Sequence, residues 1–147
     1  MKMKIVIVKS EAELKDAYPI RGTVFIEEQK VEPEIEHDEF DETAIHFVGY
    51  ADDKAVAAGR LRWVDGYGKL ERLCVLKEYR GKSYGQQMIL AMEEVIAEHS
   101  YQEAKLNAQS HAEQFYVKLG YETVSDEFYD AGIPHVTMTK KLSSSVK

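Results

Sequence analysis

Apolar positions in the first third of the chain follow the spacing of a strand and then of a helix. Residues 4–8 form a β-branched run that predicts a strand. Ser10 with Glu13 three residues later matches a capping box, which predicts a helix beginning at Ser10. Pro19 is expected to kink or divide this helix, whose apolar positions are Leu14, Ala17, Val24 and Phe25.

The middle of the chain predicts a run of strands. Residues 29–43 are acidic and show no apolar periodicity, so we interpret them mostly as loop. Three apolar runs follow at 45–51, 55–64 and 70–75, separated by short polar turns. Turns of this length join antiparallel neighbours, so three consecutive antiparallel strands are expected.

The last part of the chain alternates helices with strands. Tyr84, Met88, Ala91 and Val95 recur at helical spacing, which predicts a helix of roughly 15 residues. A short strand is predicted at 104–108. Ser110 with Glu113 forms a second capping box, which predicts a helix that runs to Leu119, with Gly120 as its C-cap. Late strands are predicted at 121–124 and 135–139.

These elements predict an α/β fold with a mixed sheet. The length of the chain indicates how many domains it forms. A chain of 147 residues has room for one domain, which we expect at 1–142. The serine-rich residues 143–147 are expected to form a flexible tail.

Composition excludes several classes of protein. Hydrophobic residues make up 44% and charged residues 31% of the chain, the balance of a folded, soluble domain. The apolar runs are too short for a membrane span or a signal peptide. Cys74 is the single cysteine, so neither a disulfide nor a cysteine-based zinc site is expected, and a reducing, cytoplasmic location is predicted. The formal net charge of −7 argues against nucleic acid as a partner.

The negative charge is concentrated in one segment. Residues 27–42 contain nine acidic residues and one lysine, so this segment nets −8 and the other 131 residues net about +1. Such a segment either steers a cationic ligand or is a solvated loop that favours solubility. His37, Asp38 and Asp41 do not follow the spacing of a calcium loop, and no metal is expected.

The motif R-G-K-S-Y-G at residues 80–85 follows a predicted strand and opens the predicted helix. Free backbone N–H groups at a helix N-terminus, together with the helix dipole, favour a phosphate group. The segment lacks the glycine pattern of a P-loop and of a dinucleotide fingerprint. Taken alone, it indicates either an anion site or an ordinary helix start with surface bases.

The order of these elements and two of the motifs resemble the GNAT superfamily of acyl-CoA N-acyltransferases. Arg80 and Gly85 match the ends of that family's pyrophosphate loop, and Ser83 stands where its middle glycine is usual. Residues 104–121, ending F-Y-V-K-L-G-Y, resemble its fifth strand and the following helix, and Val24–Gln29 resembles its first-helix region. The resemblance covers residues 5–142 and implies a mostly antiparallel sheet whose fourth and fifth strands splay apart.

The resemblance also implies a site for acetyl-CoA as cosubstrate. Backbone groups of the fourth strand would contact the acetyl and pantetheine portion, the N–H groups of 80–85 would hold the pyrophosphate, and Asn107 would lie on the other side. The cofactor-binding residues implied are Leu73, Cys74, Val75, Arg80, Gly81, Lys82, Ser83, Tyr84, Gly85 and Asn107. Cys74 is not expected to act as a nucleophile, because transfer in this family is direct and needs no acyl-enzyme.

Two residues are candidates for catalysis. Tyr116 would protonate or stabilise the departing thiolate; without the resemblance, an amphipathic core tyrosine is the more common interpretation. Glu71 would take the proton of the attacking amine; the alternative is a surface glutamate paired with Lys69 or Arg72. Strand alternation predicts that Glu71 shares a face with Leu73 and Val75, unless a bulge reverses the assignment.

The function implied is transfer of an acetyl group from acetyl-CoA to a primary amine in a ternary complex. An acyl-CoA-binding regulatory module without turnover is the alternative, and an acyl-homoserine-lactone-synthase-like enzyme is a third reading. The acceptor is expected to be a small-molecule or peptide amine, without nucleic acid or membrane partners. A homodimer is a reasonable expectation.

Overall fold

The computed structural model describes residues 3–142, and the predicted tail at 143–147 lies outside them. Eight strands form one sheet in the order β1-β2-β3-β4-β5-β8-β6, with β7 paired to β8. The strands are β1 (Lys4–Ile7), β2 (Ile45–Ala51), β3 (Lys54–Val64), β4 (Tyr67–Val75), β5 (Glu103–Gln109), β6 (Glu122–Thr123), β7 (Phe128–Asp130) and β8 (Ile133–Lys141). The mixed α/β sheet predicted from the pattern and the mostly antiparallel sheet implied by the resemblance are therefore confirmed.

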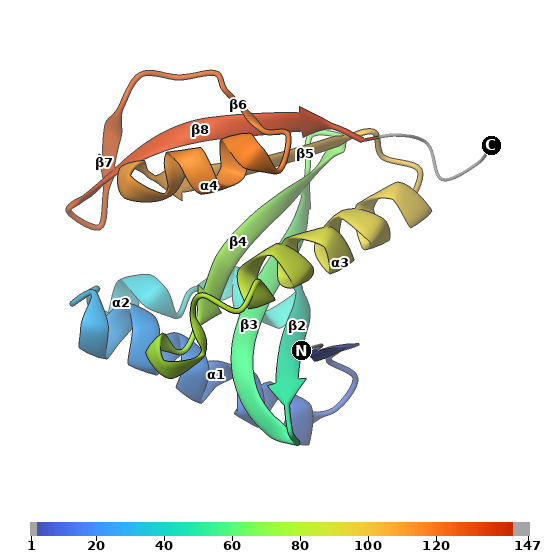
Figure 1. The fold of residues 1–147 in the computed structure, drawn as a ribbon, viewed down its shortest axis with the longest axis vertical. Coiled ribbons are helices and arrows are strands. Elements are labelled where there is room, and N and C mark those ends of the chain that lie inside the picture. The colour runs from blue at the N-terminus through green and yellow to red at the C-terminus, as the bar shows by residue number, and fades with distance from the viewer. Residues whose placement is uncertain (1–2, 143–147) are drawn as a thin grey trace.

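Helices cover both faces of the sheet (Figure 1). They are α1 (Glu11–Arg21), α2 (Pro33–Glu36), α3 (Tyr84–Glu98) and α4 (Glu113–Lys118), with a π-helix η1 (Gly22–Glu28) and short 3-10 turns η2 (Glu39–Glu42), η3 (Lys77–Tyr79) and η4 (Ser110–Ala112). Within residues 3–142, no helix is both long enough and apolar enough to cross a membrane.

The buried hydrophobic residues fall into two clusters, one on each face. Met88, Met92 and Ile96 of α3 pack with Leu61, Leu70 and Leu106 of the sheet and form the larger cluster. Ala17 and Ile20 of α1 pack with Val48, Ala58 and Cys74 on the opposite face. The sheet is thus the central layer, and each apolar helix stripe predicted from its spacing covers one side of it.

The predicted strands at 45–51, 55–64 and 70–75 form the expected antiparallel run. Asp52 and Asp53 both have positive φ, 51° and 66°, as a tight hairpin turn requires. The second turn is shorter than expected, because β4 begins at Tyr67 and only Asp65 and Gly66 stay outside the strands. The strand β7 was not predicted, because its three residues are too few to show a pattern.

Local expectations around three segments need correction. Pro19 does not divide α1, and the helix widens to a π-helix at Gly22, where the backbone N–H donates to the carbonyls of Tyr18 and Pro19. The acidic 29–43 segment is not mostly loop, since it contains α2 and η2. Ser110 does not cap a helix: its hydroxyl donates to Glu127, and α4 begins three residues later.

Candidate active site

A cleft of about 1090 Å³ opens where β4 and β5 separate. The two strands pair in parallel only between residues 68–70 and 104–106. Beyond Leu70 and Leu106 they diverge, and their ends become the two walls of the cleft. The splayed pair of central strands that the resemblance implied is therefore present. Figure 1 shows the consequence, with β5, β8 and α4 standing apart from β2, β3 and α1.

The cleft brings together residues that are far apart in the sequence, from Val24 to His135. Of the predicted site residues, those that line it are Glu71, Leu73, Cys74, Val75, Arg80, Gly81, Ser83, Tyr84, Gly85, Asn107 and Tyr116. Lys82 is exposed and does not line the cleft, so its side chain lies apart from the others.

Gln29 and Gln109, which sequence reasoning missed, close the cleft from the side of η1. Gln109 at the end of β5 donates to Gln29 (Nε2 to Oε1, 2.8 Å), although 80 residues separate them. His111 Nε2 lies 2.7 Å from Gln109 Oε1. The resemblance of Val24–Gln29 to the family's first-helix region was the signal available, but it assigned no contact to Gln29.

The loop before α3 has the backbone of an anion cradle. Gly81 and Ser83 both take positive φ, 79° and 64°, and Ser83 is the N-cap of α3 in the left-handed region. Among the described residues, the amide N–H groups of 81–86 have no backbone acceptor. Several adjacent donors thus meet at the positive end of a 15-residue helix.

Arg80 is held at the edge of this loop by two partners. Its Nε donates to the Val75 carbonyl at 2.9 Å. Its two terminal nitrogens donate to the Glu28 carboxylate, each at 2.8 Å. The Glu28 bond raises the pKa of Arg80 and lowers that of Glu28. Arg80 therefore connects η1, the end of β4 and the loop.

A bulge in β4 decides which backbone groups face the cleft. Arg72 has φ 54°, and the register of β3 with β4 shifts between Ala58 and Arg60. The Leu76 N–H donates to Val56 of β3 at 2.9 Å. Backbone groups alternate between the two edges of a strand, so those of Leu73 and Val75 point toward the cleft.

The bulge also corrects the predicted orientation of Glu71. Leu73 and Val75 pack toward the α3 cluster and Cys74 toward the α1 cluster. Glu71 lies on the α1 side, because its carboxylate accepts from Arg60 and Arg62. Glu71 therefore does not share a face with Leu73 and Val75, since the extra residue shifts the alternation.

Glu71 belongs to an acid–arginine cluster, which we define as Arg21, Glu36, Asp38, Asp41, Arg60 and Glu71. Arg60, 1% exposed, donates to Glu71 (2.6 Å), Asp38 (2.6 Å) and Asp41 (3.0 Å). Arg21, also 1% exposed, donates to Glu36 and Asp41, each at 2.7 Å. The buried acids of the 27–42 segment are therefore neutralised internally.

These contacts change the proton affinity of Glu71. Burial opposes ionisation, but the hydrogen bonds of Arg62 and the charges of Arg60 and Lys69 outweigh it and lower the pKa of Glu71 to about 2. A carboxylate with this pKa is a weak proton acceptor at neutral pH. The role of Glu71 as general base stays a prediction, and the pairing with Lys69 named as its alternative is present at 3.3 Å.

Cys74 and Tyr116 are both affected by burial. Burial raises the pKa of the Cys74 thiol to about 12, so it stays protonated and is a poor nucleophile. Tyr116 of α4 lines the cleft and packs edge-on against Phe115 and Tyr121. Burial raises its pKa to about 12, so its hydroxyl keeps its proton and can donate a hydrogen bond.

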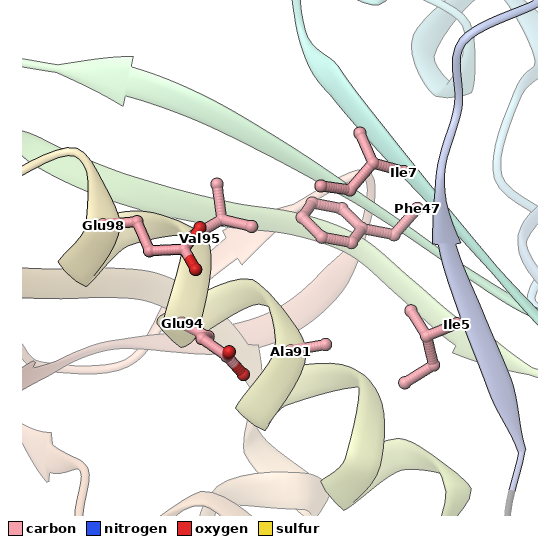
Figure 2. Close-up of a pocket in the computed structure, with 7 residues that line it drawn as sticks. All are labelled: Ile5, Ile7, Phe47, Ala91, Glu94, Val95 and Glu98. Carbon is pink, nitrogen blue, oxygen red and sulfur yellow. The ribbon is translucent and has the colours of Figure 1, made fainter. Parts of the chain in front are cut away.

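A second hollow, of about 200 Å³, lies between β1 and α3 (Figure 2). It is lined by Ile5, Ile7, Phe47, Ala91, Glu94, Val95 and Glu98. Its polar side chains are two glutamates, and it lies apart from the anion cradle. The β4–β5 cleft is therefore the candidate active site.

Comparison with known proteins agrees with this geometry. Residues 9–142 match the family model described as an acetyltransferase (GNAT) domain. YjcF of Bacillus subtilis, an uncharacterized N-acetyltransferase, is 48% identical over 139 residues, covering 94% of this chain and 99% of its own.

Two solved structures extend the comparison. A Lactobacillus plantarum protein assigned as an N-acetyltransferase superposes with a TM-score of 0.90 at 29% identity, covering 97% of this chain and all of its own. A GNAT family acetyltransferase of Elizabethkingia anophelis, solved with acetyl-CoA bound, shares the fold with a TM-score of 0.75 at 11% identity, covering 95% and 98% of the two chains. With its splayed central strands and the loop before α3, this chain belongs to the GNAT family of acetyltransferases.

Proposed function

We propose that this protein transfers an acetyl group from acetyl-CoA to a primary amine by direct attack in a ternary complex. The observation that carries the proposal is one continuous cleft that joins the anion cradle at 81–86, the cleft-facing backbone edge of β4 and Tyr116. The acetyl-CoA seen with the Elizabethkingia anophelis protein, which shares this fold, supports the choice of cosubstrate.

The cradle and the β4 edge fit the parts of acetyl-CoA. The N–H groups of 81–86 and the α3 dipole would hold the pyrophosphate. The backbone of Leu73 and Val75 would pair with the pantetheine amides as a neighbouring strand does. A backbone N–H near Val75 would polarise the thioester carbonyl as an oxyanion donor. Asn107 on the β5 wall, whose Oδ1 accepts from Thr137, would line the other side.

In the transfer step, the neutral amine nitrogen forms the new C–N bond, and the C–S bond breaks with its electron pair leaving on sulfur. Tyr116 would donate a hydrogen bond or its proton to that sulfur, because its hydroxyl stays protonated at neutral pH. After the attack, the positively charged nitrogen would give up its proton to solvent, directly or through Glu71, whose carboxylate, with a pKa of about 2, would be a weak general base.

Thermal unfolding with and without acetyl-CoA tests the binding part. Acetyl-CoA at 100 times its Kd should stabilise the native state by about 2.7 kcal/mol and raise Tm by several degrees. Arg80→Ala should reduce this shift, and the matched control Lys15→Ala, an exposed base on α1, should not. The absence of any shift in the wild type would overturn the proposal.

Release of free thiol with a panel of primary amines tests the transfer part. Amine-dependent thiol release, with the acetylated amine detected by mass spectrometry, is the expected result. Binding of acetyl-CoA with no acetylated product from any amine would instead support the acyl-CoA-binding regulatory module.

A further inference from the structure

Two of the carboxylates that line the cleft, those of Glu71 and Asp38, have few hydrogen-bond acceptor positions left for a ligand. Glu71 accepts from Arg60 and Arg62 through four hydrogen bonds and also pairs with Lys69. Asp38 accepts two hydrogen bonds on each oxygen, from the Phe40 N–H, Arg60 and Arg72. A cationic amine arriving here would have to displace an arginine from these oxygens.

Hydrogen-bond donors, in contrast, are in excess on this wall of the cleft, around Glu71 and Asp38. Arg62 uses Nε and one terminal nitrogen on Glu71, and its second terminal nitrogen makes no hydrogen bond with the described residues. Within residues 3–142, Lys69 Nζ has one ion-pair contact, at 3.3 Å to Glu71, although it can donate three hydrogen bonds. The wall and the groups behind it hold four carboxylates (Glu36, Asp38, Asp41, Glu71) against five cations (Arg21, Arg60, Arg62, Lys69, Arg72).

The position of Arg62 and Lys69 is suitable for binding the acceptor substrate. Leu70 packs toward α3, so its neighbours Lys69 and Glu71 point to the opposite face, away from the anion cradle. Arg62 is the register partner of Lys69, and its guanidinium lies 3.8 Å from the Phe40 ring centre, which keeps it in place. Asp130, at the exposed turn of the β7–β8 hairpin, is the one cleft-lining carboxylate of residues 3–142 without an ion pair.

We propose that Arg62 and Lys69 bind an anionic group of the acceptor, so that the preferred acceptor is an amine that also carries a carboxylate or a phosphate-type group. This inference rests on the proposed function and names its substrate class. The excess positive charge also favours the neutral form of a bound amine, which is the form that attacks the thioester.

Matched acceptors test the proposal. β-Alanine and ε-aminocaproate are compared with n-propylamine and n-hexylamine, and aminoalkylphosphonates of the same lengths distinguish a carboxylate site from a phosphate-type site. The wild type is expected to favour the anionic member of a pair in kcat/KM by at least about tenfold, as a charge-assisted contact provides. Lys69→Gln should reduce this ratio severalfold with the KM for acetyl-CoA unchanged.

The matched control is Lys105→Gln, because Lys105 is the register partner of Lys69 on β5 and does not line the cleft. Arg62→Gln provides a second variant, and the acetyl-CoA thermal shift verifies that each variant is folded. Equal turnover of anionic and plain amines by the wild type, or a ratio unchanged in both variants, would overturn this inference alone. Binding of acetyl-CoA without turnover of any amine would overturn the proposed function with it.

Discussion

Glu28 and Arg80, 52 residues apart, face each other at the edge of the cleft through two hydrogen bonds of 2.8 Å each. The pair connects the π-helix η1 to the loop that precedes α3. Both side chains are about two-fifths exposed, 38% and 40%, so the pair contributes little to stability. The pair is instead expected to affect phosphate binding, since it places the Glu28 carboxylate beside the anion cradle.

Glu28→Gln should therefore strengthen acetyl-CoA binding. Removing the carboxylate frees the Arg80 guanidinium for phosphate and ends a repulsion, and we expect Kd to fall about three- to tenfold at low salt, with a smaller effect at high salt. Isothermal titration calorimetry measures this. Glu78→Gln, an exposed glutamate on η3, is the control. A weaker affinity in Glu28→Gln would mean that Glu28 positions Arg80 rather than competes for it.

Ser83→Gly should preserve acetyl-CoA binding and increase stability by up to about 1 kcal/mol. Ser83 has φ 64°, a conformation that costs a residue with Cβ roughly 1–2 kcal/mol and costs glycine little, although glycine loses more chain entropy on folding. Chemical denaturation measures the change. Ser83→Ala is the control, since it keeps the strained backbone and loses only the hydroxyl that accepts from Gln87. Greater stability of the alanine variant would contradict this reasoning.

Tyr116→Phe should lower kcat by at least about tenfold and leave the acetyl-CoA thermal shift in place, because the ring packs in the core and only the hydroxyl would reach the leaving sulfur. Steady-state kinetics with free-thiol detection measures kcat. Tyr101→Phe, which removes a hydroxyl beside Trp63 outside the cleft, is the control. Unchanged turnover in Tyr116→Phe would remove this role.

The pH dependence should follow the acceptor rather than a side chain. With the pKa of Glu71 at about 2, its carboxylate stays ionised throughout the neutral range and contributes no break there. We expect kcat/KM to rise about tenfold per pH unit up to the pKa of the amine, and the break to move when the amine is changed. Rates measured with two amines of different pKa test this. A break near the usual pKa of histidine, about 6.5, with both amines would indicate a histidine base.

Acid should destabilise the protein through Glu71. Its pKa is lowered from 4.5 to about 2 in the folded state, so the folded state binds fewer protons than the unfolded state as pH falls. The stabilisation is complete above about pH 5 and is lost between about pH 5 and pH 2, and its size is on the order of 3 kcal/mol.

Urea denaturation across this pH range measures the effect. Glu71→Gln should be less stable at neutral pH and should lose less stability on acidification than the wild type. Glu42→Gln, at an exposed position of η2, should follow the wild-type curve. Parallel curves for wild type and Glu71→Gln would contradict the coupling.

Much of the fold follows from local pattern. Apolar runs at 45–51, 55–64 and 70–75, with short turns between them, are sufficient for three antiparallel strands, because period and turn length are properties of neighbouring residues. The stripe of Tyr84, Met88 and Val95 likewise predicted α3. The R-G-K-S-Y-G motif could be recognised as a possible anion site for the same reason, since a strand, a loop and a helix start follow one another in sequence.

Only the tertiary structure decided the charges around the site. The acidic 27–42 segment looked like one negative surface, but Glu36, Asp38 and Asp41 are paired with Arg21, Arg60 and Arg72, which come from other elements. The bulge at Arg72 turned Glu71 into the same cluster and away from Leu73. Ion pairing and register depend on which segments meet in space, so spacing along one segment could not reveal that arginine and lysine side chains line the cleft.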